Sequence, residues 1–356
     1  MPMKSIGFAG TAKNTGKTTA ALAVLDACQS AGMLPALTSI GFDGENRDHI
    51  TGLPKPRYTA RPGTLIATTS ECLKTSSARV RILESTGIRT VLGTVLIGEV
   101  EEPGTILLVG PNRSSDLTQV FQRFAAYGVD LTLVDGALNR LVPMSACDGV
   151  ILSTGAAFNE DIETLAKHAS ALVTLMQRPL TTKNHYPMDR FTLRLAGQPN
   201  VHLPLGSLLG EDTLNLFLRA MHTPVEEMVI PGACRPDLLE RLLQEKSALF
   251  QNASLIFGSP LKLVASADPR RWEDLFSSSS IAAQVAFLSR LPVRFLTVNP
   301  FFPRYSPKTG EYIAGYLDKA DLLKRMRAAL PSLPVIDVRQ PPLPDIPALL
   351  NSQPGG

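Results

Sequence analysis

Two glycines, a lysine and a threonine near the N-terminus have a spacing that suits phosphate binding. Residues 10–18, GTAKNTGKT, resemble the pattern G-x-x-x-x-G-K-[ST], although five residues instead of four separate Gly10 from Gly16. Gly10 and Gly16 let the backbone wrap closely around an anion, Lys17 adds a positive charge, and Thr18 offers a hydroxyl to Mg²⁺. We therefore expect a nucleoside triphosphate such as ATP to bind here. The alternative is an ordinary glycine-rich turn with a solvated lysine.

The expected nucleotide contacts include the whole loop and the residue after it. They are Gly10, Thr11, Ala12, Lys13, Asn14, Thr15, Gly16, Lys17, Thr18 and Thr19. In one branch of P-loop ATPases a second lysine stands five positions before the invariant one. Here that position is Ala12 and Lys13 is one residue late, so we assign Lys13 no role across a subunit interface.

Two aspartates are candidates for the acidic group that holds magnesium. Asp135 ends the apolar run at 131–134, which is the pattern of a Walker B strand, although it also suits the start of a turn before Gly136. Asp43 ends the strand expected after the helix of the loop, and a turn at Asp43-Gly44 is its alternative. We expect Lys17, Asp43 and Asp135 to act in catalysis. We expect Thr18, Asp43 and Asp135 to hold Mg²⁺.

The elements around the loop predict an α/β fold. Residues 4–9 form an expected strand, 17–32 a helix closed by Gly32, and 35–40 a second strand. This is the opening βαβ unit of a doubly wound, mostly parallel sheet, and with the loop it predicts a P-loop NTPase fold. Residues 51–104 break the rhythm and predict a β-rich insertion.

The predicted elements divide the chain into two α/β parts. We expect a nucleotide-binding domain over 1–177, a proline-broken linker over 178–204 and a C-terminal α/β domain over 205–356. The sequence alone leaves open whether that last part is a separate unit or a continuation of the first sheet. The elements expected in it are helices at 212–221, 235–247, 281–288 and 317–330, and strands at 227–230, 254–257, 293–298 and 335–338.

Composition excludes several classes of protein. In 356 residues, 44% are hydrophobic and 19% charged, which is typical of a globular chain. No apolar run approaches the roughly 18 residues of a membrane span, and a net charge of +3 gives no reason to expect nucleic acid. Four cysteines and five histidines are scattered without the spacing of a zinc site or a disulfide framework, so we expect a cytoplasmic protein.

Other segments have weaker claims to a function. Three loops follow expected parallel strands and would line the site or recognise the base, although each also suits a plain turn: Gly110-Pro111-Asn112-Arg113, Asn139-Arg140 and Thr154-Gly155. His168 lies in an expected helix and suits a packed or surface position better than a ligand position. The aromatic segment at 299–305, NPFFPRY, suits either a partner contact or a rigid packed loop.

The loop and three further segments resemble a known family. The loop, with Asp43-Gly44 after the next strand, looks like the P-loop branch of dethiobiotin synthetase and the MinD-type ATPases. Within that branch, IGFDGE at 40–45, TGLPKP at 51–56 with RPGTLIA at 61–67, and VDGALNR at 134–140 resemble the P-loop reactivase subunit of adenosylcobalamin-dependent lysine 5,6-aminomutase; a looser likeness continues to VNP at 298–300. The resemblance implies ATP and Mg²⁺ at Gly10–Thr18, with Asp135 in the acidic position. Its implied partners are the aminomutase, a companion reactivase subunit or a second copy of the chain.

Three functions fit these observations. The first is an ATPase whose hydrolysis changes loops near Asp43 and Asp135 and acts on a partner protein, as in a reactivase. The second is an ATP-dependent ligase or kinase with a small-molecule substrate. The third is a module that binds ATP tightly and hydrolyses it slowly. Stimulation by a protein or by a small molecule separates the first two.

Overall fold

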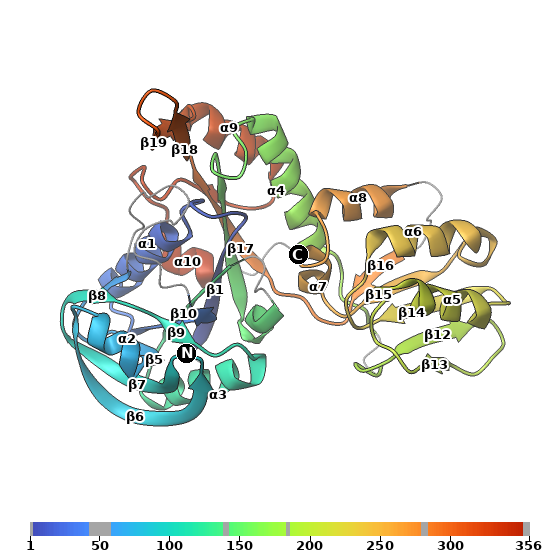
Figure 1. Cartoon of the computed structure of the whole chain (residues 1–356), viewed down its shortest axis with the longest axis horizontal. Coiled ribbons are helices and arrows are strands. Elements are labelled where there is room, and N and C mark those ends of the chain that lie inside the picture. Colours follow the sequence, from blue (N-terminus) through green and yellow to red (C-terminus); the bar gives the residue numbers. More distant parts are fainter. Residues whose placement is uncertain (1–2, 43–57, 138–141, 183–185, 279–283, 352–356) are drawn as a thin grey trace. The chain divides into compact units, whose positions relative to one another are not determined.

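The chain folds into two compact units. The structure is a computed structural model that describes residues 3–42, 58–137, 142–182, 186–278 and 284–351. The first unit combines Met1–Ala166 with Pro292–Gly356, and the second is Lys167–Leu291. Figure 1 shows this division, because the red end of the chain returns to the unit that holds its blue beginning.

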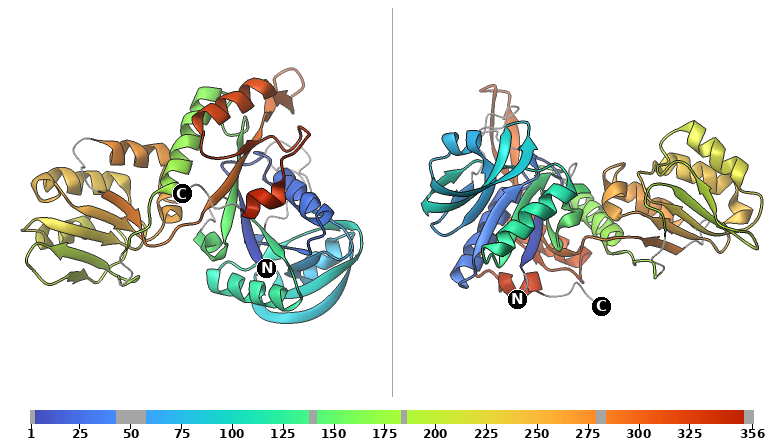
Figure 2. Two further views of the ribbon diagram at one scale, coloured as in Figure 1. Left: turned by 180° about the vertical axis from the view of Figure 1, so that it is seen from behind. Right: turned by 90° about the horizontal axis from the view of Figure 1, so that it is seen from below.

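A nine-stranded sheet forms the centre of the first unit. Its order is β20-β17-β11-β1-β10-β2-β5-β7-β6. Figure 1 labels six of these strands (β17, β1, β10, β5, β7 and β6), and Figure 2 shows the chain from two other sides. Neighbours from β20 to β5 pair in parallel, whereas β7 is antiparallel to both β5 and β6. The strands are β1 (Lys4–Gly10), β2 (Pro35–Ser39), β5 (Leu65–Thr69), β6 (Arg79–Thr90), β7 (Gly93–Glu102), β10 (Leu131–Ala137), β11 (Gly149–Gly155), β17 (Val293–Asn299) and β20 (Val335–Ile336).

Apolar residues on both faces of this sheet explain why it is covered on both sides. Successive side chains of a strand point to opposite faces, so Leu37 joins one core cluster and its neighbour Ala36 another. The first cluster packs against helices α1 and α10, the second against α3. The helices of this unit are α1 (Lys17–Ser30), α2 (Ser70–Thr75), α3 (Ser114–Ala126), α9 (Lys319–Ala329) and α10 (Ile346–Asn351), and α4 (Ile162–Gln177) begins in it.

The predicted insertion at 51–104 is rich in strands, but its long strands extend the main sheet. Strands β5, β7 and β6 continue the sheet beyond β2. Among the described residues in and next to this region, two small antiparallel pairs lie outside the main sheet: β4 (Tyr58–Ala60) with β8 (Gly104–Ile106), and β3 (Gly41–Phe42) with β9 (Val109–Gly110). This part of the chain therefore enlarges the sheet that carries the loop at residues 10–18, for which the sequence predicts phosphate binding (hereafter the phosphate loop).

The second unit has its own five-stranded sheet. The order is β13-β12-β14-β15-β16, in which β14, β15 and β16 are parallel and β12 is antiparallel to β13 and β14. Its strands are β12 (Phe191–Leu195), β13 (Val201–Leu203), β14 (Val225–Ile230), β15 (Ser254–Phe257) and β16 (Gln284–Phe287). Its helices are α5 (Glu211–Ala220), α6 (Pro236–Glu245), α7 (Pro260–Val264) and α8 (Pro269–Ser277).

Several predicted boundaries are wrong. The expected linker at 178–204 contains β12 and β13, which belong to the second sheet. The expected domain at 205–356 is split, because β17 and β20 return to the first sheet and β17 pairs with β11. The expected helix at 281–288 is strand β16 where the structure describes it.

Every helix in the described part of the chain is too short or too polar to span a bilayer.

Candidate functional site

Four parallel strands bring polar residues to one edge of the first sheet. Strand β1 ends at Gly10, which lies opposite Ser153 of β11. On the other side of β1, Asp135 of β10 lies opposite Phe8. Strand β11 ends at Gly155, opposite Asn299, the last residue of β17. These are carboxyl ends of adjacent strands in an open α/β sheet, where ligands bind in such folds.

The loop after β1 has the backbone that its glycines predict. Gly16 has φ +90° and precedes the helix, and Asn14 has φ +65°, so both lie in the left-handed region. Gly10 has no room for a side chain, since a Cβ there would lie 2.6 Å from the Thr15 hydroxyl. That hydroxyl donates to the carbonyl of Ala12 over 2.9 Å, which closes the loop on itself.

Helix α1 presents its N-terminal turn at the end of this loop. Lys17, Thr18 and Thr19 form the turn, and Gly16 as N-cap provides no side-chain hydrogen bond to it. The first N–H groups of a helix have no carbonyl within the helix, and the dipole makes this end positive. A phosphate is the kind of ligand that such amides and Lys17 bind together.

Lys17 and Asp135 meet in an ion pair. The Lys17 Nζ lies 2.8 Å from the Asp135 Oδ1, and the two side chains are only 14% and 8% exposed. The sequence predicted both residues independently, one from the loop and one from the end of an apolar strand. The structure confirms that they come together, next to the N-terminal turn of α1.

Further polar residues at this edge hold the loop from its other side. The backbone N–H of Thr11 donates to the Ser153 carbonyl over 2.9 Å, and its hydroxyl bonds the Thr154 hydroxyl over the same distance. The side chain of Asn299 donates from Nδ2 to the carbonyl of Asn14 over 2.9 Å. The sequence named Thr154-Gly155 and Asn299 only as parts of loops. Their contact with residues 10–16 depends on which strands pair, which no local spacing reveals.

The remaining candidates divide between positions near and away from this edge. Asp43, Asn139 and Arg140 lie outside the described residues. Gly110 is close to the end of β2, because a Cβ on it would lie 1.8 Å from the Ser39 carbonyl oxygen. It ends β9, however, which pairs with β3 and lies outside the main sheet. His168 is buried and belongs to the second unit, which agrees with a packed histidine.

The donor atoms at the site suit magnesium bound together with phosphates. Mg²⁺ favours oxygen ligands, keeps several waters and is usually held by one or two protein oxygens plus phosphate. The hydroxyl of Thr18 and the carboxylate of Asp135 are oxygen donors of this kind. Among the described residues, no three His, Cys, Asp or Glu side chains are grouped so that they could hold a metal by themselves. The site therefore fits a metal that arrives with a nucleotide.

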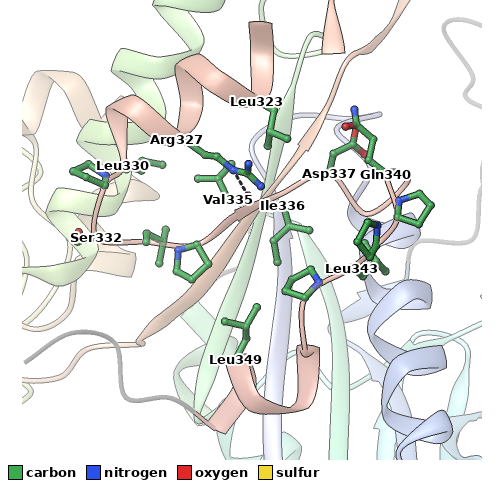
Figure 3. A pocket seen from close by; sticks show the side chains of 16 residues that line it. Leu323, Arg327, Leu330, Ser332, Val335, Ile336, Asp337, Gln340, Leu343 and Leu349 are labelled. Atoms are coloured by element: carbon green, nitrogen blue, oxygen red, sulfur yellow. Dashed lines mark hydrogen bonds between the residues drawn. The ribbon is translucent and has the colours of Figure 1, made fainter. Parts of the chain in front are cut away.

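A pocket of about 890 Å³ lies elsewhere in the first unit, along β20 and the segment after it (Figure 3). No residue of the phosphate loop lines it. Three of its polar side chains already bind one another or the backbone: Arg327 Nε donates to the Val335 carbonyl, and the Asp337 carboxylate accepts from Gln340 Nε2. The pocket walls are mainly proline and leucine, so the pocket offers little chemistry for a phosphate.

Comparison with family models and curated proteins identifies no family, so any functional assignment depends on the geometry of this site. No protein-family model matches the chain, and no curated protein matches its sequence. The class that the fold defines is an α/β protein with a large, mostly parallel sheet.

Proposed function

We propose that this protein binds and hydrolyses ATP with Mg²⁺, as an enzyme of the P-loop class. The observation that carries the proposal is the position of Lys17. It lies in the first turn of the helix that follows a central parallel strand, after a loop that closes on itself, and 2.8 Å from Asp135 on the neighbouring strand. A loop, a lysine and an acid in this relation provide the parts that hold a triphosphate.

The ion pair suggests how the site responds to the nucleotide. Without phosphate, Asp135 neutralises the positive charge of Lys17. A triphosphate has several negative charges and draws Lys17 toward itself, which releases the carboxylate of Asp135. Lys17 and the amides of the first turn of α1 then stabilise the negative charge on the transferring phosphoryl group. Mg²⁺, when bound through Thr18 and Asp135, adds positive charge at the phosphates.

We further propose that hydrolysis acts on a partner protein, an adenosylcobalamin-dependent aminomutase that the ATPase reactivates. The support is the resemblance of three segments to the reactivase subunit. Two of them meet at the site, because the N–H of Ile40 donates to the carbonyl of Asp135 over 2.7 Å. Residues 43–45, 51–56 and 138–140 of the three segments lie outside the described part of the chain.

The test compares the wild type with Lys17→Ala. ATP binding and hydrolysis are measured with Mg²⁺, alone and with a purified cobalamin-dependent aminomutase that turnover has inactivated. Lys17→Ala removes a charge-assisted contact to phosphate and should weaken ATP binding about 10- to 100-fold. Lys324→Ala, an exposed lysine on α9, is the matched control and should bind ATP like the wild type.

Each outcome decides one part of the proposal. If the mutase raises hydrolysis and regains activity only with the wild type, the reactivase function is supported. If ATP binds and is hydrolysed but the mutase changes nothing, the partner is wrong, and small molecules are screened for stimulation as in a ligase or kinase. If the wild type binds no nucleotide, the P-loop assignment itself is wrong.

A further inference from the structure

Asn299 contacts the phosphate loop at its two left-handed residues. Its Nδ2 donates to the carbonyl of Asn14 over 2.9 Å, and Asn14 has φ +65°. Its side chain also lies over Gly16, since a Cβ on Gly16 would be 3.2 Å from the Cβ of Asn299. Both residues have left-handed backbone, which Gly16 adopts readily but which an L-residue such as Asn14 rarely adopts, so the backbone at Asn14 needs to be held.

The hydrogen bond fixes the direction of a backbone amide in the loop. In a trans peptide the carbonyl and the next N–H point in opposite directions. With the Asn14 carbonyl held by Asn299, the N–H of Thr15 points away from Asn299. Thr15 is buried, and its hydroxyl is already bonded to Ala12, so this peptide has little freedom to turn. A single side chain thus sets the orientation of the loop in its middle.

The same side chain also binds the start of a hairpin. The Oδ1 of Asn299 accepts from the N–H of Phe301 over 3.2 Å. Phe301 begins β18 (Phe301–Ser306), which pairs only with β19 (Glu311–Tyr316) within the described chain. The assignment of the two amide atoms is chemically forced, because a carbonyl must receive the NH₂ group and an N–H must meet the oxygen.

The shape of the β18–β19 hairpin depends on its contacts with neighbouring residues. A two-stranded hairpin alone is marginally stable, so contacts at its ends matter to its shape. It presents large exposed side chains at Tyr305, Ile313 and Tyr316. One planar amide, that of Asn299, connects this hairpin to the phosphate loop.

We propose that Asn299 is a positioning residue of the phosphate loop and couples the loop to the β18–β19 hairpin. The inference rests on the nucleotide site proposed above. It states that Asn299 acts on phosphate binding through the backbone at 14–16. Its effect is therefore the same for any ligand with the same phosphates, whether or not a base is attached.

The first test measures the dissociation constants of MgATP and of magnesium tripolyphosphate, which has no base. Asn299→Ala should weaken both by the same factor, roughly 3- to 10-fold, as one hydrogen bond is lost. Asn299→Asp keeps the acceptor for Phe301 but sets an oxygen against the Asn14 carbonyl, so it should weaken both further. Asn351→Ala, an exposed asparagine on α10, is the control.

The outcomes separate this inference from the proposed function. If Asn299→Ala weakens ATP but leaves tripolyphosphate unchanged, Asn299 contacts the nucleoside and the positioning role is refuted. Wild-type affinity in both variants also refutes it while leaving the proposed function intact. Failure of the wild type to bind either ligand instead removes the proposed function.

A second measurement needs no variant and so does not depend on its folding. Hydrogen exchange is followed in the wild type with and without MgATP. The coupling predicts that ATP slows exchange in the phosphate loop and also in β18. Protection of the loop with unchanged exchange in β18 would show that the hairpin is not coupled to it.

Discussion

The ion pair between Lys17 and Asp135 should contribute measurably to the stability of the first unit. Its atoms are 2.8 Å apart and both side chains are mostly buried. At this distance and an effective dielectric constant of about 20, two unit charges attract by about 6 kcal/mol. The loss of hydration of both groups offsets most of this attraction, so we expect a net coupling of about 2 kcal/mol.

A double-mutant cycle measures this coupling. Lys17→Met and Asp135→Asn each remove one charge with little change of shape, and each should lower the free energy of unfolding by about 3 kcal/mol. The double variant removes both charges together. It should cost about 4 kcal/mol, less than the two single effects combined, because neither charge then remains buried without the other.

The assay has to follow the first unit. Hydrogen exchange of peptides from β1 and β10 reports on it directly, because these strands pair with Phe8 opposite Asp135. The single tryptophan of the chain, Trp272, is fully buried in the second unit, so its fluorescence in urea gives a separate measurement of that unit. A coupling below about 0.5 kcal/mol would refute the reasoning, since additive effects mean no interaction. The proposed exchange of Lys17 between Asp135 and phosphate would then lose its basis.

Two further predictions concern the backbone and pH. Gly16→Ala forces a side chain onto φ +90° and against Asn299, so it should lower the melting temperature and weaken ATP binding. The control is Gly32→Ala, at φ +77° with open space around it. It should lower the free energy of unfolding only by the backbone cost of about 1 kcal/mol and should leave ATP binding normal. Burial lowers the pKa of His168 below its ordinary value of 6.5, so the unfolded chain binds the proton more tightly. Stability to urea, followed by Trp272 fluorescence, should therefore fall as pH drops below about 6.5, by at most about 1.4 kcal/mol per pH unit, and His168→Leu should remove this dependence. An unchanged pH profile in His168→Leu would contradict the assignment.

Local patterns predicted the elements well where length and flanking residues were informative. The strand expected at 254–257 is β15 with the same bounds, and the helix at 212–221 is α5 within one residue. The helix expected at 281–288 failed because a short apolar run such as VAFL suits a strand as well as a helix. Only pairing with β15 decides it in favour of a strand.

The division into domains depended on information that is not local. The segment at 293–298 was correctly predicted as a strand, but nothing in its residues shows which sheet it joins. In the structure β17 follows the second unit in sequence but belongs to the first unit. There it pairs with β11, more than a hundred residues earlier in the chain. The expected domain at 205–356 was wrong for this reason.

The same distinction applies to the site. The loop of residues 10–18 was found because all its parts are adjacent in sequence. Asp135 was predicted because an apolar run that ends in an acidic residue is itself a local pattern. Asn299 meets the loop only because β17 pairs with β11, and its spacing from Asn14 in sequence conveys no information.

The pairing of β11 with β17 also places the two connections that leave the site. After Gly155, at the end of β11, the chain continues through α4 into the second unit. After Asn299, at the end of β17, it continues into the β18–β19 hairpin. Both strand ends touch the phosphate loop, through Thr154 bonded to Thr11 and through Asn299 bonded to Asn14. If nucleotide binding changes the loop as proposed, the change acts at the start of both segments. The contact to the hairpin is then removed by substituting Asn299, which leaves Lys17 and Asp135 in place.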